Sequence, residues 1–387
     1  MTEQVLVHQA ASACSTAADA AAAVREVIEG FGAVDAGAVV FFASPALDGD
    51  VVRAGLAGRF PGVPVIGCTT AGEFTETRTT TGGLSAVALP RDVVRSSAVA
   101  LADLGAGASA GIRAAVGELE QRLGSPLRDL DPQRYVGIAL IDGMHGDEEE
   151  VNEALGNAAP LLSFVGGSAG DDLAFAQTLV SVGTTASTHG AVLLVLELAV
   201  PFAIVKTCSF EEAGTSFTIT RADLAQRVVW ELDGRPAAEV YAAAVGRTAD
   251  DLDASAFMSH PLGLMIDGRP WIRSPQQVVP GGGIKFYCQI LEGMTVELMR
   301  STDLVAETAT ALRRAAAEVG GEASGAVMFN CILRRLETDA KQAQQPFVDA
   351  VAALGAPSAG FHTYGESWLG HMNQTLTAIV FGRSPQP

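Results

Sequence analysis

A short phrase that could do chemistry recurs three times in this chain: a hydroxyl residue, a spacer, a glycine and an acid. The copies are Thr70–Glu73, Ser168–Asp171 and Thr363–Glu366. The glycine lets the backbone turn sharply or approach another group closely, and the carboxylate can accept hydrogen bonds from a ligand. The same residue types also form ordinary turns and caps that need no ligand. Any single copy favours the turn, whereas three copies together favour a binding role for at least one.

Each copy lies within the same series of predicted elements: helix, strand, helix, strand, loop and strand. In the first series the helical stretches span residues 18–29 and 51–60, and the apolar strand-like runs span 38–42, 63–66 and 84–89. The second series runs from residue 111 to 198, and the third from 304 to 381. The matching order indicates an old duplication of an α/β unit.

The phrase stands where ligands bind in open α/β sheets, because loops that leave the carboxyl ends of strands line the binding crevice. We therefore expect a small-molecule site in a cleft lined by the three loops. Its candidate residues are Thr70, Gly72, Glu73, Ser168, Gly170, Asp171, Tyr364, Gly365 and Glu366.

The length of 387 residues predicts two domains. Residues 1–200 hold the first two units, whose continuous apolar strands predict a helix-covered and partly parallel sheet. Between about 200 and 300, alternating runs and the Asp267–Gly268 dipeptide predict antiparallel hairpins. Residues 201–387 would combine this mostly antiparallel sheet with the third unit. The expected fold class is α/β, with three related units divided between two domains.

Composition excludes several classes of function. The net charge of −19, with no concentrated basic patch, argues against nucleic-acid binding. The five cysteines form no CxxC pair and are expected to be reduced core thiols. The N-terminus lacks the pattern of a signal peptide. The most apolar stretch, 191–205, contains Glu197 and Pro201 and is too short to span a membrane. We expect a cytoplasmic protein that does not insert into membranes.

The second copy also satisfies the GxSxG pattern of a hydrolase, over Gly166–Gly170. A nucleophile elbow would expose Ser168 on a strained turn that leads directly into a helix. Here the residues after Asp171 lead toward another strand-like run instead, and the other copies carry threonine in place of the serine. We therefore expect no enzymatic activity. A serine hydrolase that uses Ser168 remains the alternative, as does a scaffold that binds only protein partners.

Some of the histidines are candidate metal ligands. His145 and Asp147 lie close in sequence, but together with Glu148–Glu150 they are typical of an acidic helix start. His371 and His260 each have apolar neighbours, as an axial haem ligand requires. A lone histidine in such surroundings is more often a packed or capping residue, and this is the alternative to haem binding for both. Arg269 or Arg273 could pair with the haem propionates.

Several of these segments together resemble the FIST domain, named for F-box and intracellular signal transduction proteins. The segments are VIGCTTAGEF from Val65, VGGSAGDD from Val165, and the later FNCILRRLE, GFHTYGE and NQTLTAIVFG. The resemblance covers residues 30 to 382 and includes both the N-terminal and the C-terminal FIST parts. It implies a sensory module that binds a small molecule and is coupled to a kinase or cyclase domain or partner.

The layout is similar to that of the bacterial haem-binding nitric oxide sensors of this family, which act on a partner histidine kinase. This resemblance implies Glu73, Asp171, Glu366 and Asn373 as pocket residues. In close relatives the C-terminal motif reads GMHxNQT, whereas the stretch Gly370–Thr375 is one residue shorter here. The shift changes the register of His371 within the motif.

Overall fold

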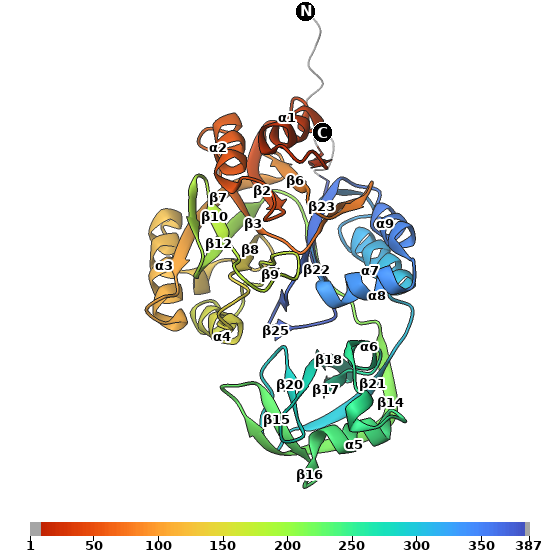
Figure 1. Cartoon of the computed structure of the whole chain (residues 1–387). Coiled ribbons are helices and arrows are strands. Elements are labelled where there is room, and N and C mark those ends of the chain that lie inside the picture. Colours follow the sequence, from red (N-terminus) through yellow and green to blue (C-terminus); the bar gives the residue numbers. More distant parts are fainter. Residues whose placement is uncertain (1–8, 384–387) are drawn as a thin grey trace, which may run out of the picture. The chain divides into compact units, whose positions relative to one another are not determined.

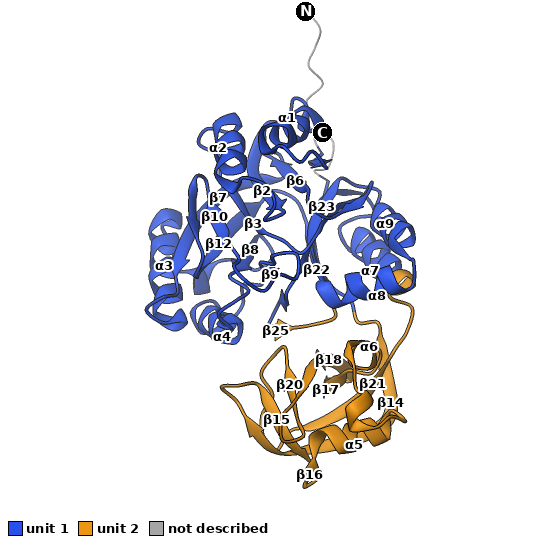
Figure 2. Cartoon of the chain, in the orientation of Figure 1, with its two compact units in different colours: residues 1–207, 308–370, 376–387 blue, residues 208–307, 371–375 orange. Residues whose placement is uncertain are grey.

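The structure is a computed structural model that describes residues 9–383. Its contacts separate two compact units, shown in Figure 2. Unit 1 holds residues 1–207, 308–370 and 376–387, and unit 2 holds residues 208–307 and 371–375. The mixed α/β fold class is confirmed. Most of the third α/β segment belongs to unit 1, and the division of the chain into domains at residue 200 stays a prediction.

Unit 1 contains three sheets with the same arrangement (Figure 1). The first has the order β1 (Ala11–Ser15), β6 (Leu84–Pro90), β2 (Ala36–Ala43), β3 (Val65–Thr69), β10 (Val180–Val182) and β11 (Thr185–Ser187). The second contains β7 (Val94–Asp103), β12 (Gly190–Leu198), β8 (Tyr135–Ile141), β9 (Phe164–Ser168) and β24 (Glu366–Ser367). The third contains β13 (Phe202–Lys206), β26 (Leu376–Gly382), β22 (Ala323–Cys331), β23 (Ser358–Thr363), β4 (Glu73–Thr75) and β5 (Thr79–Thr80).

Each sheet has a parallel pair at its centre, flanked by antiparallel strands. The parallel pairs are β2 with β3, β8 with β9, and β22 with β23. These strands read as continuous apolar runs because both of their faces are buried. The inner faces of the three sheets share one apolar core, in which Phe42 stacks on Phe361 and meets the edge of Phe329.

Helices cover the outer face of each sheet. The first sheet packs against α1 (Ala20–Phe31) and α2 (Gly49–Arg59), the second against α3 (Ala108–Leu123) and α4 (Glu148–Ala158), and the third against α7 (Leu304–Glu318) and α9 (Gln344–Ala352). The remaining helices of this part are α8 (Ile332–Ala340) and the short 3-10 helix η1 (Leu127–Asp129). Each outer layer buries its own apolar cluster. No helix within residues 9–383 is both long enough and apolar enough to cross a membrane.

The three sheets exchange strands in a cycle. β4 follows β3 of the first sheet but pairs with β23 of the third. β10 follows β9 of the second sheet but pairs with β3 of the first. β24 follows β23 of the third sheet but pairs with β9 of the second. Each repeated phrase lies at the crossing point from one sheet to the next.

Backbone hydrogen bonds tie the three crossing loops to one another. The Gly170 amide donates to the Thr69 carbonyl at 3.0 Å, and the Ser168 amide donates to the Gly365 carbonyl at 2.8 Å. The Ala71 amide donates to the His362 carbonyl at 3.1 Å and closes the ring. The three loops therefore lie together, and the predicted ligand cleft between them stays a prediction.

Unit 2 is mostly antiparallel, as predicted for residues 200 to 300. Its strands are β14 (Phe210–Asp223), β15 (Val228–Leu232), β16 (Arg235–Pro236), β17 (Leu262–Ile266), β18 (Arg269–Arg273), β19 (Pro275–Val279), β20 (Gly283–Phe286), β21 (Thr295–Ser301) and β25 (His371–Met372). Its helices are α5 (Ala237–Ala244), η2 (Ala249–Asp251) and α6 (Ala254–Ser259). The predicted hairpin joins β17 to β18, with Asp267 and Gly268 both left-handed at φ 49° and 70°.

We predict that Gly170→Ala destabilises the protein because the crossing loops leave no room for a side chain. A Cβ atom at this position would lie 2.7 Å from the backbone nitrogen of Ala71 and 2.9 Å from its Cβ. We expect a loss of about 1–3 kcal/mol in the free energy of unfolding, measured by urea denaturation. The control is Gly117→Ala in α3, where nothing lies within 4 Å and stability should rise slightly. Equal effects of the two substitutions would contradict this role of Gly170.

Candidate functional site

The hydroxyl and the acid of the repeated phrase bond to each other in two of the three copies. The Thr70 hydroxyl donates to the Glu73 carboxylate, and the Thr363 hydroxyl donates to the Glu366 carboxylate. All four side chains are fully buried. These hydrogen bonds are internal to each turn, as expected if a copy of the phrase forms an ordinary turn without a ligand. Gly72 supplies the sharp turn, with a φ of 107°.

Glu73 receives further donors inside unit 1. Its second oxygen accepts the Gly83 amide at 3.1 Å and the Thr80 hydroxyl at 3.0 Å. Burial nevertheless raises the pKa of the Glu73 carboxyl from its ordinary value of 4.5 to about 7, and the negative charge of Asp172 adds to the shift. The buried carboxyl is therefore protonated over much of the acidic pH range.

The second copy uses different partners. The Ser168 hydroxyl donates to Glu148 at 3.3 Å. Asp171 accepts the amides of Phe175, Ala176 and Gln177 at 2.9, 2.6 and 3.0 Å, as well as the Tyr364 hydroxyl. Burial alone would raise the pKa of Asp171, but the Tyr364 hydroxyl and the three amides outweigh it and lower the pKa. The carboxylate of Asp171 thus organises the loop that follows it.

The nine predicted loop residues are therefore brought together, and the acids of all three copies have partners within unit 1. A ligand-binding role for these nine residues stays a prediction.

The remaining predicted residues, His371 and Asn373, lie in unit 2. They belong to the short segment 371–375, which contacts β18 and the residues around it. The Arg273 guanidinium donates to the His371 carbonyl at 3.4 Å. The Gln374 side chain accepts the Ser274 hydroxyl at 2.7 Å and donates to the Met258 carbonyl, next to the end of α6, at 2.9 Å. These bonds hold the segment against the end of α6 and the start of β19.

Several buried polar atoms around this segment lack hydrogen-bond partners among the described residues. They are both ring nitrogens of His371, both amide atoms of Asn373, and Nε of Arg273. His371 is only 4% exposed and Asn373 only 1%. Each unsatisfied buried group costs about 1–3 kcal/mol, and native proteins contain few of them. Their concentration here marks segment 371–375 together with Arg273 as the candidate ligand site of unit 2.

The sequence identified His371 and Asn373 and offered Arg273 as a partner for a propionate. It missed Ser274 and Gln374, whose mutual bond orients the segment. The available signal was the polar run Asn373–Thr375 directly before an apolar strand, since such a run is unusual at a buried position.

His260, the other candidate haem ligand, caps the C-terminal end of α6. Its carbonyl accepts the Tyr241 hydroxyl at 2.6 Å. Burial and the nearby positive charge of Arg247 lower the pKa of its imidazole, so the ring is neutral at pH 7. The Met258 carbonyl that Gln374 contacts is two residues away in sequence.

The described residues contain no group of three or more His, Cys, Asp or Glu side chains that could hold a metal ion. Asp147 occupies the N-cap position of α4, and three glutamates lie in the first turn of the helix, so the acidic helix start is confirmed. The sequence did not reveal that His145 stacks on His189 with ring centroids 3.8 Å apart. Each ring of that pair bonds to an aspartate, His145 to Asp142 and His189 to Asp147.

Comparisons with known proteins identify the family. Residues 37–235 match the model of the FIST N domain, and residues 237–368 match that of the FIST C domain. No curated protein matches the chain. A crystal structure of a chorismatase is similar over 91% of this chain and 94% of that chain, with a TM-score of 0.34 and 11% identity. A likeness of this degree carries no argument about fold or function.

We predict that Glu73 makes the stability of the protein depend on pH. Because its pKa is raised from 4.5 to about 7 on folding, the folded state binds the proton more tightly than the unfolded state. The contribution is complete below about pH 4.5 and is lost as the pH rises through about 7, a total of about 3 kcal/mol.

Urea denaturation between pH 4 and 8 measures this dependence, and Glu73→Gln should flatten the profile in that window. Glu118→Gln serves as the control, because the side chain of Glu118 is exposed on α3. If the pH profile of Glu73→Gln runs parallel to that of the wild type, the pKa of Glu73 does not differ between the folded and unfolded states.

Proposed function

Since the chain belongs to the FIST family, whose domains are generally associated with sensory signal transduction, we propose that it senses a small ligand through segment 371–375 and Arg273. The unpartnered atoms of His371, Asn373 and Arg273 are the observation that carries this proposal. These atoms make no hydrogen bonds with the described residues of the ligand-free protein, so a ligand that bonds to them would gain the free energy of those hydrogen bonds. The site would therefore gain order when the ligand arrives.

The inventory of these atoms constrains the ligand. The His371 ring offers two nitrogens, Asn373 offers two donors and one acceptor, and Arg273 Nε offers one donor. Donors outnumber acceptors, so the ligand should be rich in acceptor oxygens and carry at least one group that meets a nitrogen lone pair. Such a ligand would give each of these atoms a hydrogen-bond partner.

Haem is one group whose chemistry fits these residues. The iron would take a nitrogen of His371, and a propionate would pair with Arg273 Nε. His260 is the second candidate for the iron, because its imidazole is neutral at pH 7. Bound haem iron supplies reversible coordination of nitric oxide. The residues of this chain would hold the group and shield the bond from water.

The interlocked loops have a structural role in this proposal. Their acids bond to the loops that carry them, which supports their assignment to sheet assembly. We propose that the sensor acts on a partner histidine kinase or cyclase in the cytoplasm. The chain itself would catalyse no reaction.

We predict that His371→Leu abolishes retention of haem without destabilising the ligand-free protein. The substitution removes two unsatisfied nitrogens, so the free energy of unfolding should stay the same or rise by about 1 kcal/mol. Purified protein supplied with haem should show a Soret band that nitric oxide shifts, and the variant should lose this band on gel filtration. His145→Ala in unit 1 is the matched control and should keep it.

Three outcomes would count against this site. If His371→Leu retains haem and His260→Ala loses it, the ligand is His260. If both variants retain haem, neither histidine binds the iron. A large loss of stability in His371→Leu without ligand would show that its ring nitrogens are satisfied in solution.

The alternative of a serine hydrolase makes an opposite prediction. Ser168 is fully buried, its hydroxyl donates to Glu148, and its strand β9 is followed by a loop and β10. We expect no labelling by a fluorophosphonate probe over hours, in parallel with a known serine esterase that reacts within minutes. Labelling that Ser168→Ala abolishes would overturn the assignment as a non-enzyme.

A further inference from the structure

Within residues 9–383, strand β13 of unit 1 has one free edge. Among the described residues it lies at the end of the third sheet and pairs only with β26. The Pro201 carbonyl accepts the Gly382 amide and the Thr207 amide donates to the Leu376 carbonyl, at 2.8 and 2.9 Å. Hydrogen-bonded residues alternate along an antiparallel ladder. The backbone groups of Phe202 and Ile204 therefore point away from β26, toward the open edge.

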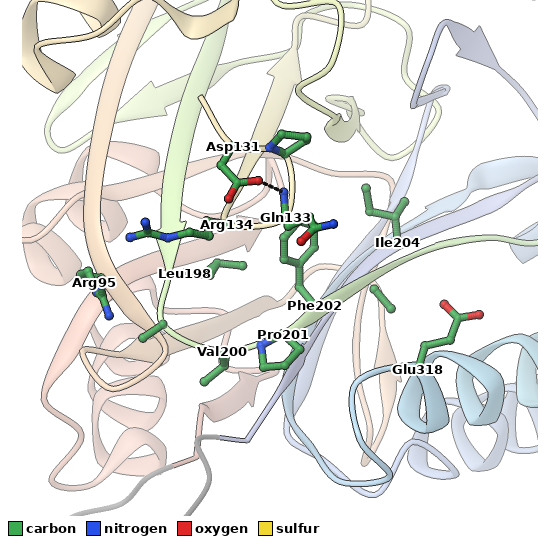
Figure 3. Close-up of a pocket in the computed structure, with 13 residues that line it drawn as sticks. Arg95, Asp131, Gln133, Arg134, Leu198, Val200, Pro201, Phe202, Ile204 and Glu318 are labelled. Carbon is green, nitrogen blue, oxygen red and sulfur yellow. Dashed lines mark hydrogen bonds between the residues drawn. The ribbon is translucent and has the colours of Figure 1, made fainter. Parts of the chain in front are cut away.

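This free edge lines a groove of about 800 Å³ (Figure 3). Phe202 and Ile204 form one part of it, and the connection Leu198–Pro201 and the segment Asp131–Arg134 form much of the rest. The side chains of Phe202 and Ile204 are only partly buried and pack on the inner core. The groove thus offers unpaired backbone groups beside an apolar surface.

The charges around the groove nearly balance. Arg134 forms an ion pair with Glu197, and Arg95 approaches the same carboxylate at 3.9 Å. Glu318 pairs with Arg314 at 2.9 Å. The Asp131 carboxylate accepts the Gln133 amide. A strongly charged ligand would gain little here, which favours an occupant of low net charge.

We propose that β13 accepts an extended segment of a partner protein as an added strand. The free donors and acceptors of Phe202 and Ile204 repeat every second residue, roughly 7 Å apart, a spacing that another extended backbone matches. Alternate apolar side chains of the segment would pack on Phe202 and Ile204. Pro201 precedes β13 and Lys206 ends it. Proline and lysine limit pairing at sheet edges, so the added strand would pair along Phe202–Ile204.

A display library of random octapeptides tests this proposal with the full chain as bait. Selected peptides should carry an apolar residue at every second position and have a low net charge. Ile204→Pro should weaken their binding about tenfold, because it removes one outward amide, and it leaves the bonds to β26 intact. Ile204→Val keeps the amide and an apolar side chain, so it should bind like the wild type. Equal binding to Ile204→Pro, or no selected peptide, would overturn the proposal.

Two further measurements identify the mode of binding. The amides of Phe202 and Ile204 should exchange with deuterium rapidly in the free protein and slowly with a selected peptide. N-methylation of every second peptide amide should abolish binding when the methylated amides are those that face β13. It should leave binding intact when the methylated amides are those that point away from β13. Protection of these amides by self-association, seen as a concentration-dependent dimer that Ile204→Pro dissolves, would assign the edge to a second copy of this chain and overturn the assignment to a partner.

Discussion

The cyclic exchange of strands among the three sheets is the constraint on which unit 1 depends. Each sheet is completed by a strand that arrives from another part of the chain, so none can pair fully until all three have formed. The crossing loops must pass within hydrogen-bonding distance of one another, and their amides and carbonyls form a closed ring. The same phrase recurs because the polar groups of each crossing turn need partners. In two copies the hydroxyl bonds to the acid of the same phrase, and in the second copy Asp171 accepts the amides of the loop that follows it.

The exchange also satisfies the buried polar groups of the crossing loops, in contrast to those of the proposed ligand site. At the crossings, the buried acids are occupied by donors from the loops, as with Glu73 and the Gly83 amide. In unit 2, the buried side chains of His371 and Asn373 have no such donors or acceptors among the described residues. Burial is nearly the same in the two places. The difference lies in the partners, and buried polar groups without partners are where a ligand contributes most free energy.

The sequence predicted a good part of the fold. Apolar runs between helical stretches identified the buried strands, and the Asp267–Gly268 dipeptide identified the hairpin of β17 and β18. Both signals are local. The exchange of β4, β10 and β24 between sheets could not be predicted, because pairing partners such as Phe74 and Gly360 are far apart in sequence and no local pattern encodes their choice.

The candidate site was predictable to a similar extent. Residue type and apolar neighbours were enough to select His371, and the family motif selected Asn373. Whether a buried polar group is satisfied depends on contacts such as that between Asp171 and Tyr364, which are 193 residues apart. A sequence pattern can therefore indicate polar residues that will be buried, but only the folded chain separates those that have hydrogen-bond partners from those that have none. In this protein the thrice-repeated phrase carries the stronger sequence signal, and its polar groups are the ones already satisfied.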